Sequence, residues 1–192
     1  MMRRYNKEKV VVYNTFQMYR HDRLKYLMDS FDKAQKGGYL LGAKLVRGAY
    51  MEKERDRAEE MGYESPIQEN KQATDDAFNT ALRFCVENYE KIALCNATHN
   101  VDSCKLLATL IEENNIPKDH PHLNFCQLYG MSDNITFNLA NAGYNTAKYV
   151  VYGSVADVVP YLIRRAQENS SITGDMSREY ALISKETKRR GL

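Results

Sequence analysis

The sequence predicts an α/β protein in which a parallel β-sheet is connected by crossover helices. Short apolar runs of strand composition alternate with longer stretches whose apolar residues repeat at helical spacing. This alternation occurs in five successive units, and the 192 residues are enough for one domain with a sizeable core. No low-complexity linker separates the units. We therefore expect a single domain over residues 1–192.

The expected strands are rich in β-branched and aromatic residues, which favour extended structure. They cover residues 10–19, 42–50, 92–100, 123–130 and 147–153. Each run is followed by a helical segment, so consecutive strands should lie parallel in one sheet.

The expected helices follow the strands and carry apolar residues three and four positions apart. They cover residues 23–36, 72–88, 101–114, 132–142 and 155–169, and a further terminal helix covers 177–190. Asn100 directly precedes the third of them, where its side chain is a favourable N-cap. The residues after Tyr50 are interpreted as a long insert between the second strand and the next helix.

Composition and charge exclude several classes of protein. Lys and Arg (27) nearly balance Asp and Glu (25), and a net charge of +2 does not indicate a nucleic-acid partner. No apolar run approaches the roughly 18 residues that a membrane span needs, and the basic N-terminus lacks the apolar region of a signal peptide. The cysteine spacings fit no zinc pattern. Because Cys85, Cys95 and Cys126 lie in apolar runs, we expect reduced core thiols in a cytoplasmic protein.

Polar residues gather where the expected strands end. In parallel β/α folds the carboxyl ends of the strands carry the site, so these residues are candidates for binding or catalysis. They are Gln17, Lys44, Arg47, Gly48, Tyr50, Thr98, His99, Asn100 and Gln127. A lysine that points into the fold needs an anion or an electron-rich ligand beside it. The alternative is an edge strand that exposes Lys44 and Arg47 to water.

The segment 155–169 predicts a helix with one strongly polar face. Positions i, i+3, i+4 and i+7 share a face, and here they are Tyr161, Arg164, Arg165 and Glu168. Paired guanidinium groups match a carboxylate, which suits a small anionic substrate. The opposite side carries residues that could pack, namely Val158, Leu162 and Ala166. The alternative is a solvated face with an intrahelical pair between Arg164 and Glu168.

The number of strands limits the architecture. A (β/α)₈ barrel needs eight strands and typically about 250 residues, whereas this sequence supplies five β/α units. The sheet is therefore either open or the C-terminal portion of a barrel. The sequence has no GxGxxG motif and no P-loop, so neither a Rossmann nor a Walker nucleotide site is indicated.

Read together, these segments resemble the proline dehydrogenase family. The matching motifs are YNTFQMY, AKLVRGAYMEKER, ATHN, CQLYGM, AKYVVYG and PYLIRRAQENSS, which occur in the family's order between residues 10 and 171. LVRGAY together with YLIRRAxENSS is the specific part of the match. The resemblance implies the (β/α)₈ TIM-barrel fold, here a C-terminal part with about five β/α units and a terminal helix.

The resemblance also implies a function. The family oxidises L-proline to Δ1-pyrroline-5-carboxylate by hydride transfer to FAD, and the electrons then pass to a quinone, which implies peripheral membrane contact. The implied location is cytoplasmic or at the inner membrane, and mitochondrial in a eukaryote. The FAD-side residues would be Gln17, Lys44, Arg47, Gly48, Thr98, His99, Asn100, Gln127 and Glu168. The proline pocket would comprise Tyr50, Leu128, Tyr149, Tyr161, Arg164 and Arg165, and the implied catalytic residues are Lys44, Tyr50, Arg164 and Arg165.

Two departures from the family pattern lead to further expectations. Val151 stands where the family commonly has proline, so a small local change is expected at that strand end. The family's first three strands, with a lysine and an aspartate of the substrate side, have no counterpart here. We therefore expect an inactive chain, and we expect self-association through an apolar strand edge at Val10, Val11 and Val12.

Other interpretations stay open. One is a different flavin barrel enzyme of the methylenetetrahydrofolate reductase type, although paired arginines suit an amino-acid carboxylate better than a folate. Another is a non-catalytic half-barrel that assembles with a separate N-terminal part. A free-standing anion-binding module is the third, but it would not need Gln17, Lys44 and His99 in register.

Overall fold

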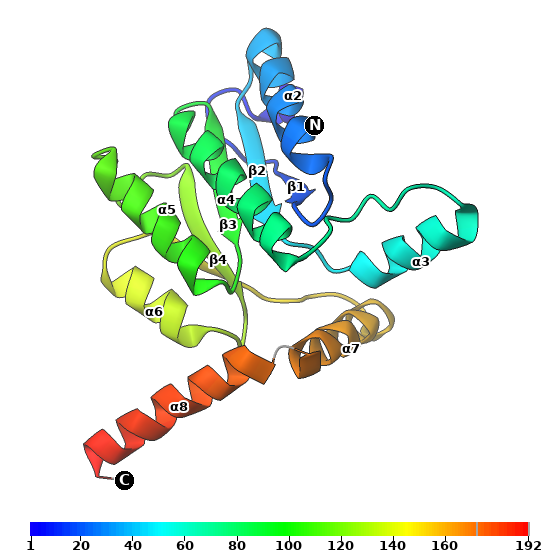
Figure 1. The fold of residues 1–192 in the computed structure, drawn as a ribbon. Helices are drawn as coiled ribbons and strands as arrows, with labels where there is room; N and C mark the ends of the chain where they lie inside the picture. Colours follow the sequence, from blue (N-terminus) through cyan, green and yellow to red (C-terminus); the bar gives the residue numbers. More distant parts are fainter. Residues whose placement is uncertain (172, 192) are drawn as a thin grey trace.

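The computed structural model contains a five-stranded parallel sheet whose strands follow one another in sequence order (Figure 1). The backbone is described for residues 1–171 and 173–191, and the side chains for residues 1–163 and 180–191. The strands are β1 (Asn14–Gln17), β2 (Leu41–Val46), β3 (Ile92–Ala97), β4 (Leu123–Leu128) and β5 (Thr146–Tyr149). Each pairs in parallel with the next, which confirms the predicted α/β class and its five β/α units.

Helices alternate with these strands. They are α1 (Met2–Tyr5), α2 (Arg23–Gly37), α3 (Met51–Met61), α4 (Lys71–Glu87), α5 (Val101–Glu113), α6 (Asp133–Asn141), α7 (Val155–Ser171) and α8 (Thr173–Arg190). The Asn100 side chain accepts a hydrogen bond of 2.9 Å from the Ser103 backbone N–H, so the predicted N-cap of α5 is confirmed. Asn70 caps α4 in the same way through the Ala73 N–H.

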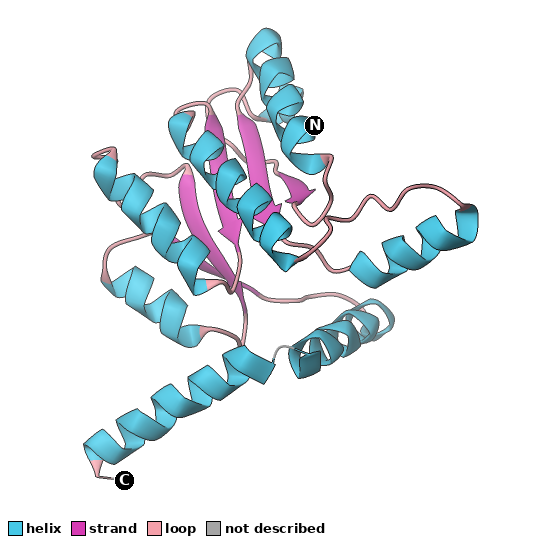
Figure 2. Cartoon of the chain, viewed as in Figure 1, coloured by secondary structure: helices cyan, strands magenta, loops and turns pink. Residues whose placement is uncertain are grey.

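The apolar core lies on one face of the sheet. Helices α2, α4, α5 and α6 cover this face (Figure 2). Phe16, Leu45, Leu94 and Phe125 project into it from four different strands, and each is fully buried. Since side chains alternate along a strand, the residues between them face the other way.

The opposite face of the sheet carries smaller and more polar residues. Lys44 lies opposite Cys95 in the register, and Ala97 lies opposite Cys126. On this face the side chains become more exposed to solvent toward the last strand, where Tyr149 is 43% exposed. In a closed barrel such a face lines the interior, whereas the open five-stranded sheet described here leaves it accessible.

The first strand is shorter than expected, and the reason is Asn6. The prediction placed a strand over residues 10–19, but β1 begins only at Asn14. The Asn6 carboxamide accepts hydrogen bonds from the backbone N–H groups of Val11 and Val12 and donates one of 2.7 Å to the Val12 carbonyl. Because Asn6 takes up these backbone groups, the expected strand edge at Val10–Val12 was wrong.

Three further expectations need correction. Residues 51–61, which were expected only as part of an insert, form helix α3, and only Ala58 of this helix is buried. Strand β5 ends at Tyr149, before the expected end at residue 153. Of the α7 residues that were expected to pack, Leu162 is 51% exposed and Val158 is half-buried, and the Ala166 side chain lies outside the described residues. In Figure 1, α8 projects away from the sheet.

Candidate active site

A cavity opens at the carboxyl ends of the strands. Its volume is about 570 Å³, within the roughly 300–1,000 Å³ typical of small-molecule sites. All twelve candidate residues with described side chains line it: Gln17, Lys44, Arg47, Gly48, Tyr50, Thr98, His99, Asn100, Gln127, Leu128, Tyr149 and Tyr161. Residues from all five strands or their following loops, and from α7, therefore meet at one place.

The remaining three candidates belong to α7. The backbone of residues 155–171 is helical, as predicted. The side chains of Arg164, Arg165 and Glu168 lie outside the described part of the chain. Tyr161, one turn earlier on the same helix, reaches the cavity wall.

Lys44 points into the cavity from the second strand of the sheet. Its Nζ lies 4.8 Å from the centre of the Tyr149 ring, within the range of a cation–π contact. The Tyr161 ring centre is 6.3 Å from that of Tyr149, so the two phenol rings extend from the lysine toward α7. Because β2 is paired on both sides, the alternative of an edge strand with an exposed Lys44 was wrong.

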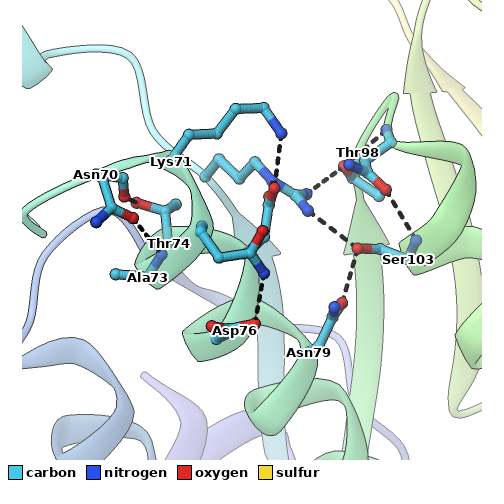
Figure 3. Close-up of polar contacts among 12 residues, drawn as sticks. Asn70, Lys71, Ala73, Thr74, Asp76, Asn79, Thr98 and Ser103 are labelled. Carbon is cyan, nitrogen blue, oxygen red and sulfur yellow. Dashed lines mark hydrogen bonds and ion pairs between the residues drawn. The ribbon is translucent and has the colours of Figure 1, made fainter.

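Arg47 is held by side chains from three different elements. Its guanidinium donates hydrogen bonds of 2.6 Å to Asp75, 2.7 Å to the Thr98 hydroxyl and 3.0 Å to the Ser103 hydroxyl. Ser103 in turn donates a bond of 2.8 Å to Asn79 (Figure 3). The guanidinium carbon also lies 4.3 Å from the centre of the Phe78 ring. Arg47 is therefore a fixed positive charge at the cavity wall, and the alternative of an arginine in open water was wrong.

Asp75 connects Arg47 to a second cavity cation. Its other carboxylate oxygen accepts a bond of 2.6 Å from Lys71, which also lines the cavity (Figure 3). Burial opposes ionisation of Asp75, but the hydrogen bonds from Lys71 and Arg47 outweigh it and lower the carboxyl pKa below its ordinary value of 3.8. The carboxylate therefore stays ionised to a lower pH in the folded chain than in the unfolded chain.

This lowered pKa makes stability depend on pH. The contribution of Asp75 is fully present above its ordinary pKa and is lost as pH falls through the lower folded pKa. We expect the difference in unfolding free energy between the parent chain and Asp75→Asn to be largest near neutral pH and to shrink below pH 3.8. Urea unfolding followed by circular dichroism at several pH values measures it.

Asp76→Asn is the matched control for this prediction. Asp76 lies next to Asp75 on α4, is exposed, and accepts its hydrogen bond from the neutral Gln72. The prediction is contradicted if the loss of unfolding free energy in Asp75→Asn stays the same down to pH 2.5. It is also contradicted if Asp75→Asn and Asp76→Asn show the same loss at every pH.

The segment from Thr98 to Asn100 is fixed by its neighbours at the end of β3. The Gln127 amide donates a bond of 3.1 Å to the Thr98 carbonyl and accepts one of 2.9 Å from the Thr136 hydroxyl. His99 Nδ1 lies 2.8 Å from the Ser132 hydroxyl oxygen. These contacts orient the side chains before any ligand binds, which reduces the cost of ordering them later.

Gly48 is required by the fold itself. Its φ of +123° lies in the region that favours glycine. A Cβ placed there would lie 1.6 Å from atoms of the Tyr19 ring. The prediction gave Gly48 a close approach to a ligand. It does line the cavity, but the group that approaches its backbone in this structure is Tyr19.

Tyr19 connects Gly48, a residue of the cavity wall, to helix α3. Its hydroxyl donates a bond of 3.3 Å to Glu54, which also pairs with Arg20. Burial, together with the neighbouring Glu54 carboxylate, raises the pKa of Tyr19 to about 12. The phenol therefore keeps its proton as the donor that holds Glu54, and α3 begins at a defined position beside Tyr50.

Several cavity residues were missed from the sequence. Lys71 and Asp102 lie at the starts of helices, and Met131 lies in the loop after β4. Cys126 was assigned to the core, but it faces the cavity. The signal for Cys126 was strand alternation, which places it on the same face as Leu128.

The described residues contain neither a metal-binding cluster nor a membrane-spanning helix. Among them, no group of three or more His, Cys, Asp or Glu side chains could hold a metal ion. No described helix combines the length and apolar character that crossing a bilayer requires.

The family described as "Proline dehydrogenase" matches residues 1–178. Proline dehydrogenase 1, mitochondrial, of Drosophila melanogaster is 38% identical over 200 residues, covering 99% of this chain and 29% of the fly protein. Proline dehydrogenase 2, mitochondrial, of Arabidopsis thaliana is 42% identical over 188 residues. This match covers 96% of this chain and 40% of the Arabidopsis protein. The chain thus spans well under half the length of these relatives.

Solved structures show the same fold. Proline utilization A (PutA) from Bdellovibrio bacteriovorus, inactivated by N-propargylglycine, superposes with a TM-score of 0.77 at 31% identity. The match covers 83% of this chain and 16% of that protein. The sheet is therefore the same as part of a TIM-barrel-type proline dehydrogenase domain, as the resemblance implied.

Proposed function

Since the chain belongs to the proline dehydrogenase family, we propose that the whole protein oxidises L-proline to Δ1-pyrroline-5-carboxylate with FAD as cofactor. The cavity at the strand ends is part of that active site. The observation that carries the proposal is the meeting of all twelve described candidate residues around one cavity. They come from segments far apart in the sequence, so their convergence is not a local effect.

The cavity wall fits a large anionic cofactor with an aromatic part. Lys44, Arg47 and Lys71 supply three cations, two of which share Asp75, and Asn100 and Gln127 present amide groups at the wall. Apolar side chains lie between them: Val46, Ala49, Ala97, Val101, Leu128 and Met131. Positive charge and oriented donors suit a diphosphate and a ring system that gains negative charge on reduction. When bound, FAD supplies the acceptor for the two electrons that leave the substrate.

Lys44 and Arg47 have different tasks in this proposal. Arg47 has three protein partners and acts as a fixed point charge and donor. Lys44 rests on the Tyr149 ring through a cation–π contact, so its ammonium can turn toward charge that develops nearby. A positive charge held close to developing negative charge stabilises the transition state.

The substrate end of the site would lie between β5 and α7. Tyr149 and Tyr161 present two phenol rings that could enclose the apolar part of a proline ring. Arg164 and Arg165, whose side chains lie outside the described part, follow Tyr161 by one turn. They are proposed to bind the substrate carboxylate, which would orient the ring for oxidation. Glu168 is proposed to hold one of these arginines or the cofactor.

The remaining parts of the proposal concern assembly. We infer that residues 1–192 form one domain, the C-terminal portion of the barrel. We also infer that this chain alone is inactive, because its cofactor-binding surface is incomplete. Electrons would leave to a quinone through peripheral contact with a membrane, mitochondrial in a eukaryote. The edges of β1 and β5 lack a neighbouring strand in the described sheet, so they are the places where another segment or a second copy would pair.

Complementation tests the proposal directly. The chain is co-expressed with a separate polypeptide that corresponds to the first three β/α units of the fly relative. We expect the purified complex to carry FAD, seen by its visible absorbance, and to reduce a dye only when L-proline is added. The chain alone should do neither. Lys44→Met should lower the proline-dependent rate at least tenfold, whereas Lys53→Met, an exposed lysine on α3, should not.

The outcomes separate the alternatives. A complex that binds FAD and is reduced by methylenetetrahydrofolate, and not by proline, would establish the folate-enzyme alternative. A complex that assembles without binding flavin would support the non-catalytic half-barrel. Either result overturns the proposed function.

A further inference from the structure

Lys148 is a partly buried lysine for which the proposed function has no role. It belongs to β5, where it lies opposite Gln127 of β4, and its side chain is 19% exposed. Of the described residues of β5, Tyr149 lines the cavity and Lys148 does not. Because a lysine is seldom buried without partners, the contacts of Lys148 indicate what it does in the fold.

The contacts of Lys148 converge on the loop between β4 and α6. Its Nζ donates a hydrogen bond of 2.5 Å to the Met131 carbonyl and lies 3.5 Å from the Leu128 carbonyl oxygen. It also pairs with the Asp133 carboxylate at 2.7 Å. Met131 and Asp133 are the residues directly before and after Ser132. Lys148 therefore holds the chain on both sides of Ser132.

Ser132 has a backbone conformation that needs such support. Its φ of +51° lies in the left-handed region, which residues other than glycine rarely adopt. A serine directly before a helix usually accepts a hydrogen bond from the first turn. Within α6, all of which is described, no backbone N–H donates to the Ser132 side chain. The hydroxyl oxygen instead lies 2.8 Å from Nδ1 of His99, a residue of the cavity wall.

We propose that Lys148 is a positioning residue that fixes the His99 ring through Ser132. By binding the chain on both sides of Ser132, it holds the left-handed turn, and the turn keeps the hydroxyl against the ring. The same bonds hold Met131, which also lines the cavity. A ring that is already ordered loses less entropy when a ligand binds. The consequence for FAD rests on the proposed function, in which His99 lies on the cofactor side, whereas the effect on the ring itself does not.

Lys118 provides a matched control in the same chain. It also pairs with a carboxylate, that of Glu112 at 3.0 Å, and its Nζ lies 5.0 Å from the centre of the Tyr144 ring. Lys118 precedes β4, whereas the cavity lies at the other end of that strand. Lys118→Met therefore removes a lysine and its ion pair without removing a contact of Ser132.

The NMR signal of the His99 ring tests the positioning on the purified chain. The ring is observed in ¹H–¹³C correlation spectra, and its signal among those of the four histidines is assigned by its loss in His99→Gln. We expect Lys148→Met to shift this signal in the same direction as Ser132→Ala, which removes the hydroxyl directly. Lys148→Arg keeps a charged donor with several N–H groups and should leave the signal near its parent position. Lys118→Met should not move it.

The affinity for FAD tests the consequence in the complex with the first three β/α units. We expect Lys148→Met and Ser132→Ala each to raise the Kd for FAD about tenfold, because the His99 side chain must then be ordered on binding. Lys148→Arg should stay within about threefold of the parent complex. A variant that only loses stability lowers the amount of FAD bound at saturation and leaves the Kd unchanged. The Kd therefore separates positioning from a merely structural role.

A second variant covers the case in which Lys148→Met does not fold. The Asp133 side chain is 59% exposed, so Asp133→Asn leaves the core untouched. It removes the ion pair on one side of Ser132 and should shift the His99 signal in the same direction, but by less than Ser132→Ala.

Three results would overturn the inference. One is an unmoved His99 signal in Lys148→Met, or in Asp133→Asn where that variant replaces it, while the circular dichroism is that of the folded chain. Another is an equal shift in Lys148→Met and Lys118→Met. The third is an unchanged Kd for FAD in Lys148→Met. A complex that binds no FAD, with His99 signals that respond as expected, would contradict the proposed function and support the positioning of the ring.

Discussion

Replacing Gly48 with alanine is expected to lower the free energy of unfolding by about 4 kcal/mol, because two separate penalties add. The first is backbone strain, since φ at this position is +123°. The second is steric, since the new methyl group would lie 1.6 Å from the Tyr19 ring. The ring must move, and with it the hydrogen bond from Tyr19 to Glu54 that holds α3.

Gly62→Ala is the matched control. Gly62 also has a positive φ, +69°, but nothing lies within 4 Å of a Cβ placed there. Gly62→Ala should lower the free energy of unfolding by only about 1 kcal/mol, which is the cost of backbone strain. Urea unfolding followed by circular dichroism measures both variants, and equal losses would contradict the steric explanation.

A double variant isolates the steric part at Gly48. In a Tyr19→Ala background the ring is absent, so Gly48→Ala should cost roughly 2 kcal/mol, the strain alone. If the cost of Gly48→Ala is the same with and without the Tyr19 ring, the ring is not the reason for the glycine.

Arg47→Met is expected to have the second largest effect, a loss of about 3 kcal/mol in unfolding free energy. The methionine fills the space of the side-chain stem and keeps contact with Phe78. It leaves the carboxylate of Asp75, which is only 15% exposed, with Lys71 as its remaining cation. The hydroxyls of Thr98 and Ser103 also lose a charged donor.

Arg47→Lys and a double-mutant cycle identify the cause. Lysine keeps the charge but cannot reach three partners. Arg47→Lys should therefore lower the free energy of unfolding by about half as much as Arg47→Met does. In an Asp75→Asn background, Arg47→Met should lower the free energy of unfolding by clearly less than it does in the parent chain, because no unpaired carboxylate is left. Additive losses in the cycle would mean that the ion pair between Arg47 and Asp75 does not stabilise the fold.

Arg47 also shows how far the sequence could lead to the site. Its place among the polar residues at the carboxyl end of the second strand was predicted, although that strand ends at Val46 and not at residue 50 as expected. Its partners could not be predicted, since Asp75 and Ser103 lie 28 and 56 residues away on two helices. The same holds for Lys44 and Tyr149, which only the order of the strands brings together.

The errors in the fold have a related origin. Helix α3 was missed because its sequence is dominated by charged residues and only Ala58 is buried, so it lacks an apolar repeat. The start of β1 was misplaced because three valines favour a strand by composition. Asn6, whose side chain is fully buried, binds the backbone of this segment instead. A single polar side chain at close range outweighs a propensity that is only statistical.

Local patterns in the sequence were enough to predict the alternation of strands and helices, the class of the fold and the strand ends at which the candidate residues lie. These features depend on local periodicity, which residues a few positions apart already contain. The folded chain sets which side chains meet, namely Lys44 with Tyr149, Arg47 with Asp75, and Gly48 with Tyr19. The physical reason is that strand register and helix packing set these contacts, and both are properties of the whole folded chain.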